Sequence, residues 1–445
     1  MKKLNVERLI SIGARGVASI ADQGASAAVG FLASVFIGRF IGAEALGIYA
    51  ITNVFVMLIR AVQNSLILEP MSVFGAQRRS EEKSAYFGYL IRIEAIWIGL
   101  LVLIFMACAA VAGWLGIIEP SLSHALMAGG GFTFFFCYQY LLRRQFYIEL
   151  HQYLAMTQSL FFLLLISVGA AAMSFFDGWT VVDVYIMFSI CSIVVCVVQG
   201  GRFWNMIGRP DDDARRRYNH EHWSYGKWLL LAVPLGNLTY QGYFFIVGVF
   251  VSTEAAGLLK AVDTLVAPFF QVSIGLSLML TPMVARNIDR MTVAAQARYA
   301  LKISAPLLGL GILYSGFIFF AGEFVLRALF GEQIAGAFPL IGVMSVVPIF
   351  ATMGMPASVI LAARRLAKLR FVTQAFAVAG TLLVGVPLVI MYGLMGAAFG
   401  FILTGFLFTV GQWGCLAWVW RRQSRGLPAP QPNEPHAAQQ LRSKD

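Results

Sequence analysis

The sequence is short of charged residues. Asp, Glu, Lys and Arg together make up 12% of its 445 residues, whereas hydrophobic residues make up 59%. Soluble domains carry about 25% charged residues, and the mean hydropathy here is +0.75. A chain of this composition buries most of its surface in lipid. We therefore expect an integral membrane protein, in which the net charge of +11 reflects membrane topology and not nucleic-acid binding.

Several functional motifs are also missing. No G-x-x-x-x-G-K-[ST] run is present, which argues against an internal ATP motor. The cysteines lie singly in apolar runs and predict neither a disulfide framework nor a zinc site. No long outer loop and no His/Asp/Glu constellation typical of a membrane transferase is found. We expect no cleavable signal peptide, no metal, no cofactor and no enzymatic activity.

Most of the sequence consists of long apolar segments. About twelve segments are long enough to cross a bilayer as helices, which needs roughly 20 apolar residues. They are residues 16–38, 45–68, 84–114, 123–142, 153–176, 180–204, 228–250, 255–284, 299–321, 337–363, 370–392 and 395–420. The predicted fold is an all-α membrane protein.

One segment occurs twice. At an offset of 210 residues, Glu44 matches Glu254, Gly47 matches Gly257 and Asn53 matches Asp263. With two further residues, Leu-Glu-Pro-Met at 68–71 matches Leu-Thr-Pro-Met at 280–283. Many secondary transporters consist of such internal repeats, with the substrate site between the halves. We predict a first lobe at 1–208, a cytoplasmic loop at 209–225, a second lobe at 226–425 and a disordered tail at 426–445.

Basic residues predict the orientation. Of the 33 Lys and Arg residues, 28 lie in the N-terminus, alternate loops and the C-terminus, a count that places Arg143 and Arg144 in a loop. Short loops rich in Lys and Arg stay in the cytoplasm. Both termini are therefore predicted to be cytoplasmic. Residues 209–225 include His220 and His222, which we interpret as part of a solvated linker and not as a metal site.

Polar residues within the predicted spans are candidates for a functional cavity, because they are costly in lipid. They concentrate on the first two spans and on the seventh and eighth. In the second span, spacings of seven, three and four place most of the polar residues on one face. The candidate substrate-binding residues are Arg60, Lys260, Asn53, Gln63, Asn64, Asn237, Gln241 and Arg39, and the candidate ion-coupling residues are Asp22 and Asp263.

Structural interpretations of the same residues stay open. Lys260 and Asp263 are three residues apart and are able to neutralise each other, and Asp22 is a possible structural partner of Arg60. Asn and Gln in helix bundles often only bond neighbouring helices. If Arg60 and Lys260 are instead unmatched cations, they favour an anionic cargo, and arginine suits phosphate. Proton or sodium coupling through Asp22 or Asp263 is a further hypothesis.

Two short motifs resemble a known family. Gly38-Arg39-Phe40-Ile41-Gly42, followed by Leu46-Gly47-Ile48-Tyr49, is similar to the early signature of the polysaccharide-transport, Wzx-like oligosaccharide flippases. This family belongs to the MATE-like MOP superfamily, which also contains MATE drug exporters and lipid II flippases. The resemblance implies two six-helix lobes that form a V around a central cavity. It also implies alternating access and a polyprenyl-diphosphate-linked oligosaccharide as cargo.

The first hypothesis is therefore a flippase of the bacterial cytoplasmic (inner) membrane. It would carry the lipid-linked oligosaccharide to the outer leaflet for exopolysaccharide, capsule or O-antigen assembly, beside polysaccharide polymerase or export proteins. A cation-coupled MATE-type multidrug exporter is the alternative, and it would favour a more acidic cavity. A membrane polymerase or ligase acting on the same glycans is the third hypothesis, and it would need a large outer loop.

Overall fold

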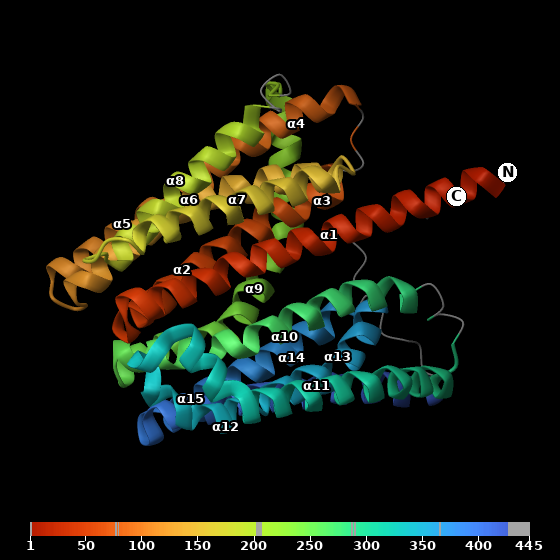
Figure 1. Ribbon diagram of the computed structural model, residues 1–445. Helices are drawn as coiled ribbons and strands as arrows, with labels where there is room; N and C mark the ends of the chain where they lie inside the picture. Colours follow the sequence, from red (N-terminus) through yellow and green to blue (C-terminus); the bar gives the residue numbers. More distant parts are fainter. Residues whose placement is uncertain are drawn as a thin grey trace. The chain divides into compact units, whose positions relative to one another are not determined.

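The structure is a computed structural model, which describes residues 2–75, 78, 80–201, 207–285, 288, 291–364 and 366–425. All regular elements in these ranges are helices, so the all-α prediction is confirmed (Figure 1). The chain divides into two compact units, Met1–Pro234 and Leu235–Asp445. The predicted tail at 426–445 lies outside the described residues.

Ten helical segments of the described chain are long and apolar enough to cross a membrane. The last of them, Leu369–Ser424, has 56 residues and covers two predicted spans. A helix rises about 1.5 Å per residue, so this segment is too long for one crossing. Its backbone breaks at Gly393, where φ is 57° and ψ is −132°. The predicted span at 228–250 lies in α9 (Asp212–Phe250), which is not among the ten segments.

In the first unit, α6 is the central helix, with α2, α5 and α8 packed against it, while α1 packs on α7. Elsewhere in the unit, π-helical turns extend or join α-helices. The elements are α1 (Lys2–Phe36), η1 (Ile37–Ile41), α2 (Ala43–Gln63), η2 (Asn64–Leu68), α3 (Glu69–Gly75), α4 (Ser80–Ile93), η3 (Glu94–Ile98), α5 (Gly99–Trp114), α6 (Pro120–Ile148), α7 (Gln152–Met173) and α8 (Val181–Gly200).

Local sequence explains where these helices begin. Gly42 has φ 118° between η1 and α2, a conformation that favours glycine. Pro120 is the first residue of α6, where its missing N–H costs nothing. Thr180 and Asp183 form a capping box at the start of α8, which satisfies two backbone donors.

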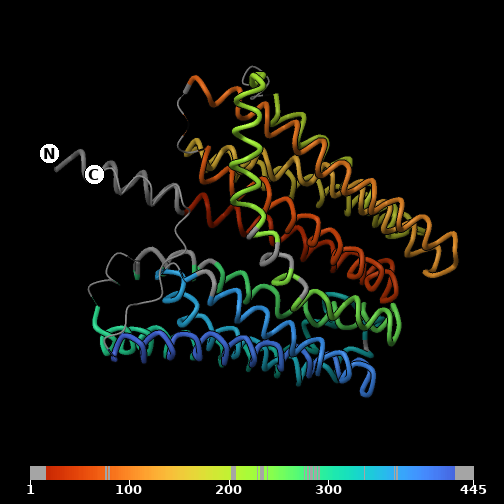
Figure 2. The backbone as a smooth tube through the Cα atoms, turned by 180° about the vertical axis from the view of Figure 1, so that it is seen from behind, coloured from red at the N-terminus to blue at the C-terminus, as the bar shows by residue number. Residues whose placement is uncertain are grey.

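In the second unit, α13 has the central place, with α10, α11 and α15 packed against it, and α14 packs on α15. The chain can be followed through this unit in Figure 2. The elements after α9 are α10 (Thr253–Ala285), α11 (Val293–Phe330), η6 (Gly331–Ala337), α12 (Phe338–Met344), α13 (Val347–Ala363), α14 (Ala367–Gly380), η7 (Thr381–Gly385) and α15 (Val386–Ser424).

The helix starts follow the sequence repeat. Helix α2 begins at Ala43 and α10 at Thr253, and 253 − 43 = 210 is the offset found in the sequence. The packing around α6 also resembles the packing around α13, since α2 and α5 correspond to α10 and α11. Each unit therefore folds on a similar plan.

The prediction of a loop at 209–225 is wrong from Asp212 onward, where the segment is helical, although most of its residues are exposed to solvent. Helix α9 begins at Asp212 and continues through it. Tyr218 is 1% exposed and His222 is 0% exposed. Tyr218 stacks edge-on against Tyr86 of α4, with ring centroids 5.1 Å apart. The segment folds because one face of its helix carries aromatic side chains that α4 buries.

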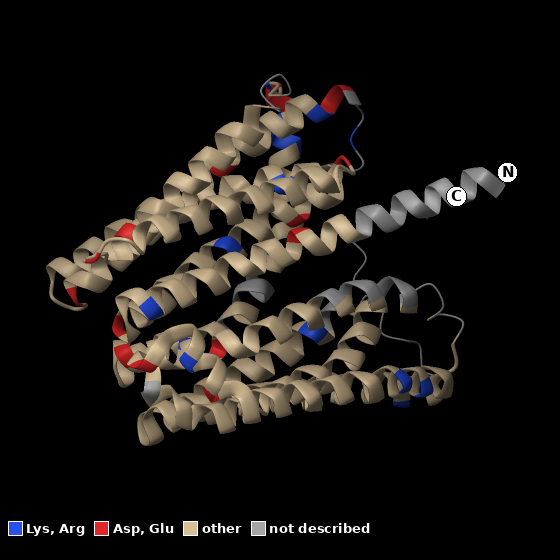
Figure 3. Cartoon of the chain, in the orientation of Figure 1, with Lys and Arg blue, Asp and Glu red and all other residues tan. Residues whose placement is uncertain are grey.

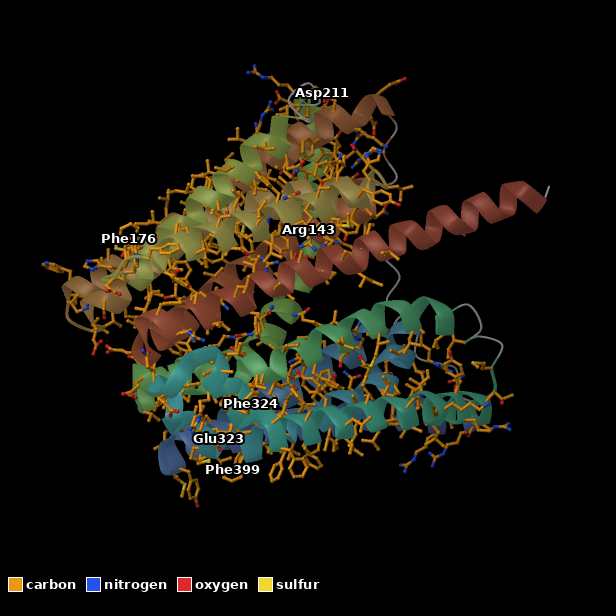
Figure 4. The ribbon with its side chains drawn as sticks, in the orientation of Figure 1. Arg143, Phe176, Asp211, Glu323, Phe324 and Phe399 are labelled. Carbon is orange, nitrogen blue, oxygen red and sulfur yellow. The ribbon has the colours of Figure 1, made fainter. Side chains whose placement is uncertain are left out.

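Charged side chains lie mostly near helix ends, and long stretches of helix between them carry none (Figure 3). Large apolar side chains instead face outward: Phe176, Phe324 and Phe399 are 68%, 76% and 47% exposed, and all three are labelled in Figure 4. Exposed aromatics on apolar helices suit a lipid environment. Together with the apolar spans they define a multi-pass membrane protein.

Candidate functional site

Asp22 lies at the centre of a buried hydrogen-bond cluster in the first unit. Its carboxylate is 0% exposed and accepts two hydrogen bonds from Arg143, at 2.9 Å from Nε and 2.5 Å from Nη2. Tyr147 donates to the same oxygen, and Ser159 donates to the other at 2.5 Å. Charge-assisted bonds of this kind are strong. Asp22, predicted as an ion-coupling group, is therefore an ion-paired carboxylate.

Two expectations are corrected by this cluster. The pairing of Asp22 with Arg60 is wrong, because Arg143 is the partner of Asp22. The placement of Arg143 and Arg144 in a loop is also wrong, because both residues lie within α6. Arg143 is 6% exposed (Figure 4), and Arg144 is half-buried.

Arg60 of α2 lies against aromatic rings of α6. Its guanidinium carbon is 3.7 Å from the ring centroid of Tyr140 and 5.1 Å from that of Phe136. Its Nη1 contacts the sulfur of Met57 at 3.5 Å. Within the described ranges Arg60 forms no ion pair, and its Nε is buried without a hydrogen-bond partner. Arg60 is thus a cation held by ring faces, with donors left free for an anion.

The space beside these residues is small. A cavity of about 20 Å³ is lined by Ser26, Tyr140, Arg143 and Ser159, among others. This volume is enough for about one water molecule. The cavity is therefore too small for an oligosaccharide.

The polar residues Gln63, Asn64 and Asn53 differ in burial and in partners. Gln63 is 0% exposed and donates to Glu94 Oε1 at 2.9 Å and to the carbonyl oxygen of Cys137 at 2.7 Å. Asn64 is half-buried and accepts a bond from Arg144 at 3.3 Å. Asn53 is also half-buried. The sequence interpretation missed Glu94, although an acid inside the apolar run at 84–114 is a signal for it.

In the second unit, Lys260 is not an unmatched cation. Its Nζ donates to Asp263 at 2.7 Å, and the two side chains are 12% and 13% exposed. Lys260 also lies 5.1 Å from the ring centroid of Phe244. The structure therefore favours the interpretation that Lys260 and Asp263 neutralise each other along α10.

The remaining predicted residues are dispersed. Asn237 and Gln241 of α9 are half-buried in the second unit. Gln241 has a buried Oε1 with no partner among the described residues. Arg39 is exposed in η1 of the first unit.

His222 belongs to a structural cluster and not to a metal site. Its Nδ1 lies 3.0 Å from the carbonyl oxygen of Leu66, and its Nε2 lies 2.8 Å from the hydroxyl of Tyr86. The carbonyl only accepts, so Nδ1 carries the proton and Nε2 accepts from Tyr86. Burial, together with the nearby positive charge of Arg78, lowers the pKa of His222 to about 4. Arg78 itself pairs with Glu221 of α9.

Comparisons with known proteins identify the fold. No family model matches, and no curated protein matches. Among solved structures, an inward-facing multidrug resistance MATE family transporter of the MOP superfamily has a TM-score of 0.72 and 13% identity, covering 92% of this chain and 95% of that one.

Two further structures are similar. The lipid II flippase MurJ, in an inward closed conformation, has a TM-score of 0.70 and 11% identity, covering 90% of this chain and 87% of that one. The MATE transporter VcmN of Vibrio cholerae has a TM-score of 0.62 and 15% identity, covering 92% of this chain and 96% of that one. The structural neighbours are thus MOP-superfamily transporters, and the chain has a MATE/MurJ-like transporter fold.

Proposed function

We propose that the protein is a flippase for a lipid-linked anion. Its cargo is a polyprenyl-diphosphate-linked oligosaccharide, carried from the cytoplasmic to the outer leaflet by alternating access. The product would serve exopolysaccharide, capsule or O-antigen assembly, with polysaccharide polymerase or export proteins as partners. The protein would bind and release this cargo without changing a covalent bond, and is therefore a transporter and not an enzyme.

Arg60 is the observation that carries this proposal. It is a cation in an apolar span, stacked on Tyr140 at 3.7 Å, and no described carboxylate pairs with it. Arg60 is half-buried, and an unpaired charge in an apolar span is costly unless a ligand compensates it. Guanidinium donors match the geometry of phosphate oxygens. A diphosphate would supply the missing counter-charge.

A transfer of the diphosphate from Arg60 to Lys260 is a further hypothesis, and the structure gives it less support because Asp263 already neutralises Lys260. We keep Lys260, Asn53, Gln63, Asn64, Asn237, Gln241 and Arg39 as secondary substrate-binding candidates, and Asp263 and Asp22 as ion-coupling candidates. Lys260 would act on cargo only after its bond to Asp263 opens. The test below therefore treats Arg60 and Lys260 separately.

A cation-coupled multidrug exporter is the second candidate. Two features favour it: the similarity to MATE transporters and the aromatic rings of Phe136 and Tyr140, which are able to stack on a cationic drug. Against it, Arg143 neutralises Asp22, and Arg60 would repel a cation. The observations above favour the anionic cargo.

The experiment is a flipping assay in proteoliposomes with a fluorescent polyprenyl-diphosphate oligosaccharide. We expect transport by the intact protein, a loss of roughly tenfold or more in Arg60→Ala, since losing about 1.4 kcal/mol of binding is tenfold, and a smaller loss in Lys260→Ala. Arg92→Ala is the matched control, because Arg92 is a basic residue exposed on α4. An intact protein that ignores this lipid but exports a cationic dye would establish the second candidate.

We also propose a location in the bacterial cytoplasmic membrane with both termini in the cytoplasm. The excess of basic residues in alternate loops supports this orientation. Reporter fusions at each end, one active only in the cytoplasm and one active only outside it, test the orientation. Activity of the outer reporter at either end would contradict it.

A further inference from the structure

Glu94 is a buried acid without a basic partner. It is the first residue of η3 and lies within the apolar span Glu81–Trp114. Its side chain is 0% exposed. Among the described residues, none of the ion pairs formed by Arg, Lys or His includes it. An ionised carboxylate in such a place lacks both water and a counter-charge.

The hydrogen bonds of Glu94 do not compensate for the missing water and the missing counter-charge. Glu94 Oε1 accepts one bond, from the amide nitrogen of Gln63 at 2.9 Å. Its Oε2 is buried and has no partner among the described residues. The second N–H of the Gln63 amide donates to the carbonyl oxygen of Cys137, so Gln63 has no further donor for Glu94. One neutral donor is a poor substitute for hydration.

Asp22 in the same unit shows the opposite environment. It accepts two bonds from Arg143 and further bonds from Tyr147 and Ser159. Those donors occupy both oxygens of the Asp22 carboxylate. Glu94 has no comparable set of donors, so its surroundings favour the neutral acid.

The other charged and titratable groups near Glu94 do not supply the missing counter-charge. Cys137 and Tyr138 of α6 interact electrostatically with it, but both are neutral when protonated. The hydroxyl of Tyr138 donates to the carbonyl oxygen of Ile91 at 3.0 Å. Arg60 of α2 is stacked on Tyr140.

The helix that leads into Glu94 offers no counter-charge either. Tyr86 and Tyr89 of α4 bond to His222 and Asn219, and Arg92 is exposed. Helix α5 carries Cys108, which is also exposed. The surroundings of Glu94 are therefore polar at one amide and otherwise electrically neutral.

Glu94 and its partner both lie at local departures from the regular α-helix. Gln63 directly precedes the π-helical turn η2, and Glu94 is the first residue of η3. Such turns occur frequently at functional sites.

We propose that Glu94 is a proton-carrying site, with Gln63 as its positioning residue. In the conformation of the structure Glu94 is the neutral acid. When a conformational change lets water reach it, its O–H bond breaks, the electron pair stays on the carboxylate, and the proton passes to a water molecule. Rebinding of a proton restores the buried state. The protonation of Glu94 is independent of the identity of the cargo.

Infrared spectroscopy of the intact protein in lipid nanodiscs tests this directly. We expect a carboxylic-acid carbonyl band at neutral pH that shifts when glutamate is labelled with ¹³C. Glu94→Gln should remove that band, whereas Asp22→Asn should leave it. Absence of any glutamic-acid band at neutral pH would overturn the proposal, and so would a band that survives in Glu94→Gln.

Two further measurements separate a positioning role from a structural one. Gln63→Leu should keep the Glu94 band but shift its frequency and its titration midpoint, because the variant loses the amide that donates to the Glu94 carboxyl. An unshifted band would remove Gln63 from the proposal. If Glu94→Gln fails to fold, the ¹³C-glutamate band of the unmutated protein still tests whether a protonated glutamate is present at neutral pH. This measurement needs no cargo and no variant. Failure of the flipping assay would therefore leave this result interpretable.

Discussion

Arg143 and Asp22 are 121 residues apart in the sequence, yet two guanidinium nitrogens of Arg143 donate to one carboxylate oxygen of Asp22. The pair joins α6 to α1 within the first unit. The side chains are 8% and 0% exposed, so neither charge has water as an alternative partner. The pair therefore makes the position of α1 depend on α6.

Removing one partner of this pair should destabilise the protein. We expect Asp22→Asn to lower the free energy of unfolding by about 3–5 kcal/mol, because it leaves a buried guanidinium unpaired. Thermal or denaturant unfolding in lipid or detergent measures this. The control is Glu323→Gln, whose pair with Arg327 is exposed and should cost no more than about 1 kcal/mol. Equal losses in the two variants would contradict the assignment.

We expect the aromatic ring of Tyr140, and not its hydroxyl, to position Arg60 for transport. Tyr140→Phe keeps the ring under the guanidinium, which lies 3.7 Å from its centroid, whereas Tyr140→Leu removes it. We expect Tyr140→Phe to retain most flipping and Tyr140→Leu to lower it about two- to thirtyfold, corresponding to a cation–π interaction of roughly 0.5–2 kcal/mol. The proteoliposome assay compares the two variants. Similar rates for both would mean that stacking does not position Arg60.

The buried His222 should make stability depend on pH. Its native pKa is lowered to about 4, and its unfolded pKa is about 6.5. Between these values the unfolded chain binds more protons, so stability falls as the pH drops through this window, by about 3 kcal/mol in total. Unfolding measured between pH 7 and about pH 4 should show this loss. The same series on His222→Gln should show a shallower dependence, and an unchanged slope would contradict the prediction.

A close backbone contact should make Gly88 sensitive to substitution. A Cβ at Gly88 would lie 1.9 Å from the carbonyl oxygen of Gly208, and the N–H of Gly208 donates to the carbonyl oxygen of Ser84 at 3.0 Å. Gly88→Ala should therefore displace the segment before α9 and lower the free energy of unfolding by about 2 kcal/mol or more. Gly131→Ala is the control, because a Cβ there meets no atom within 4 Å.

The sequence by itself predicted most of the fold. The apolar runs gave the membrane-spanning helices, and the repeat placed the starts of α2 and α10 at the observed offset. These features depend on composition and on residues near one another in the chain. The linker was the exception: 209–225 was interpreted from its charge, and the burial of Tyr218 and His222 depends on the aromatic residues of α4, more than 100 residues earlier.

The pairing of the polar residues was decided by the tertiary structure. The sequence identified Asp22, Arg60 and Lys260 as charged groups in spans. Only the packing of α1 and α6 assigned Arg143 to Asp22, and this left Arg60 on Tyr140. The packing of α2 against η3 placed Gln63 beside Glu94. A side chain three residues away, as Asp263 is from Lys260, can be anticipated from helical spacing, whereas partners on separate helices depend on how those helices pack.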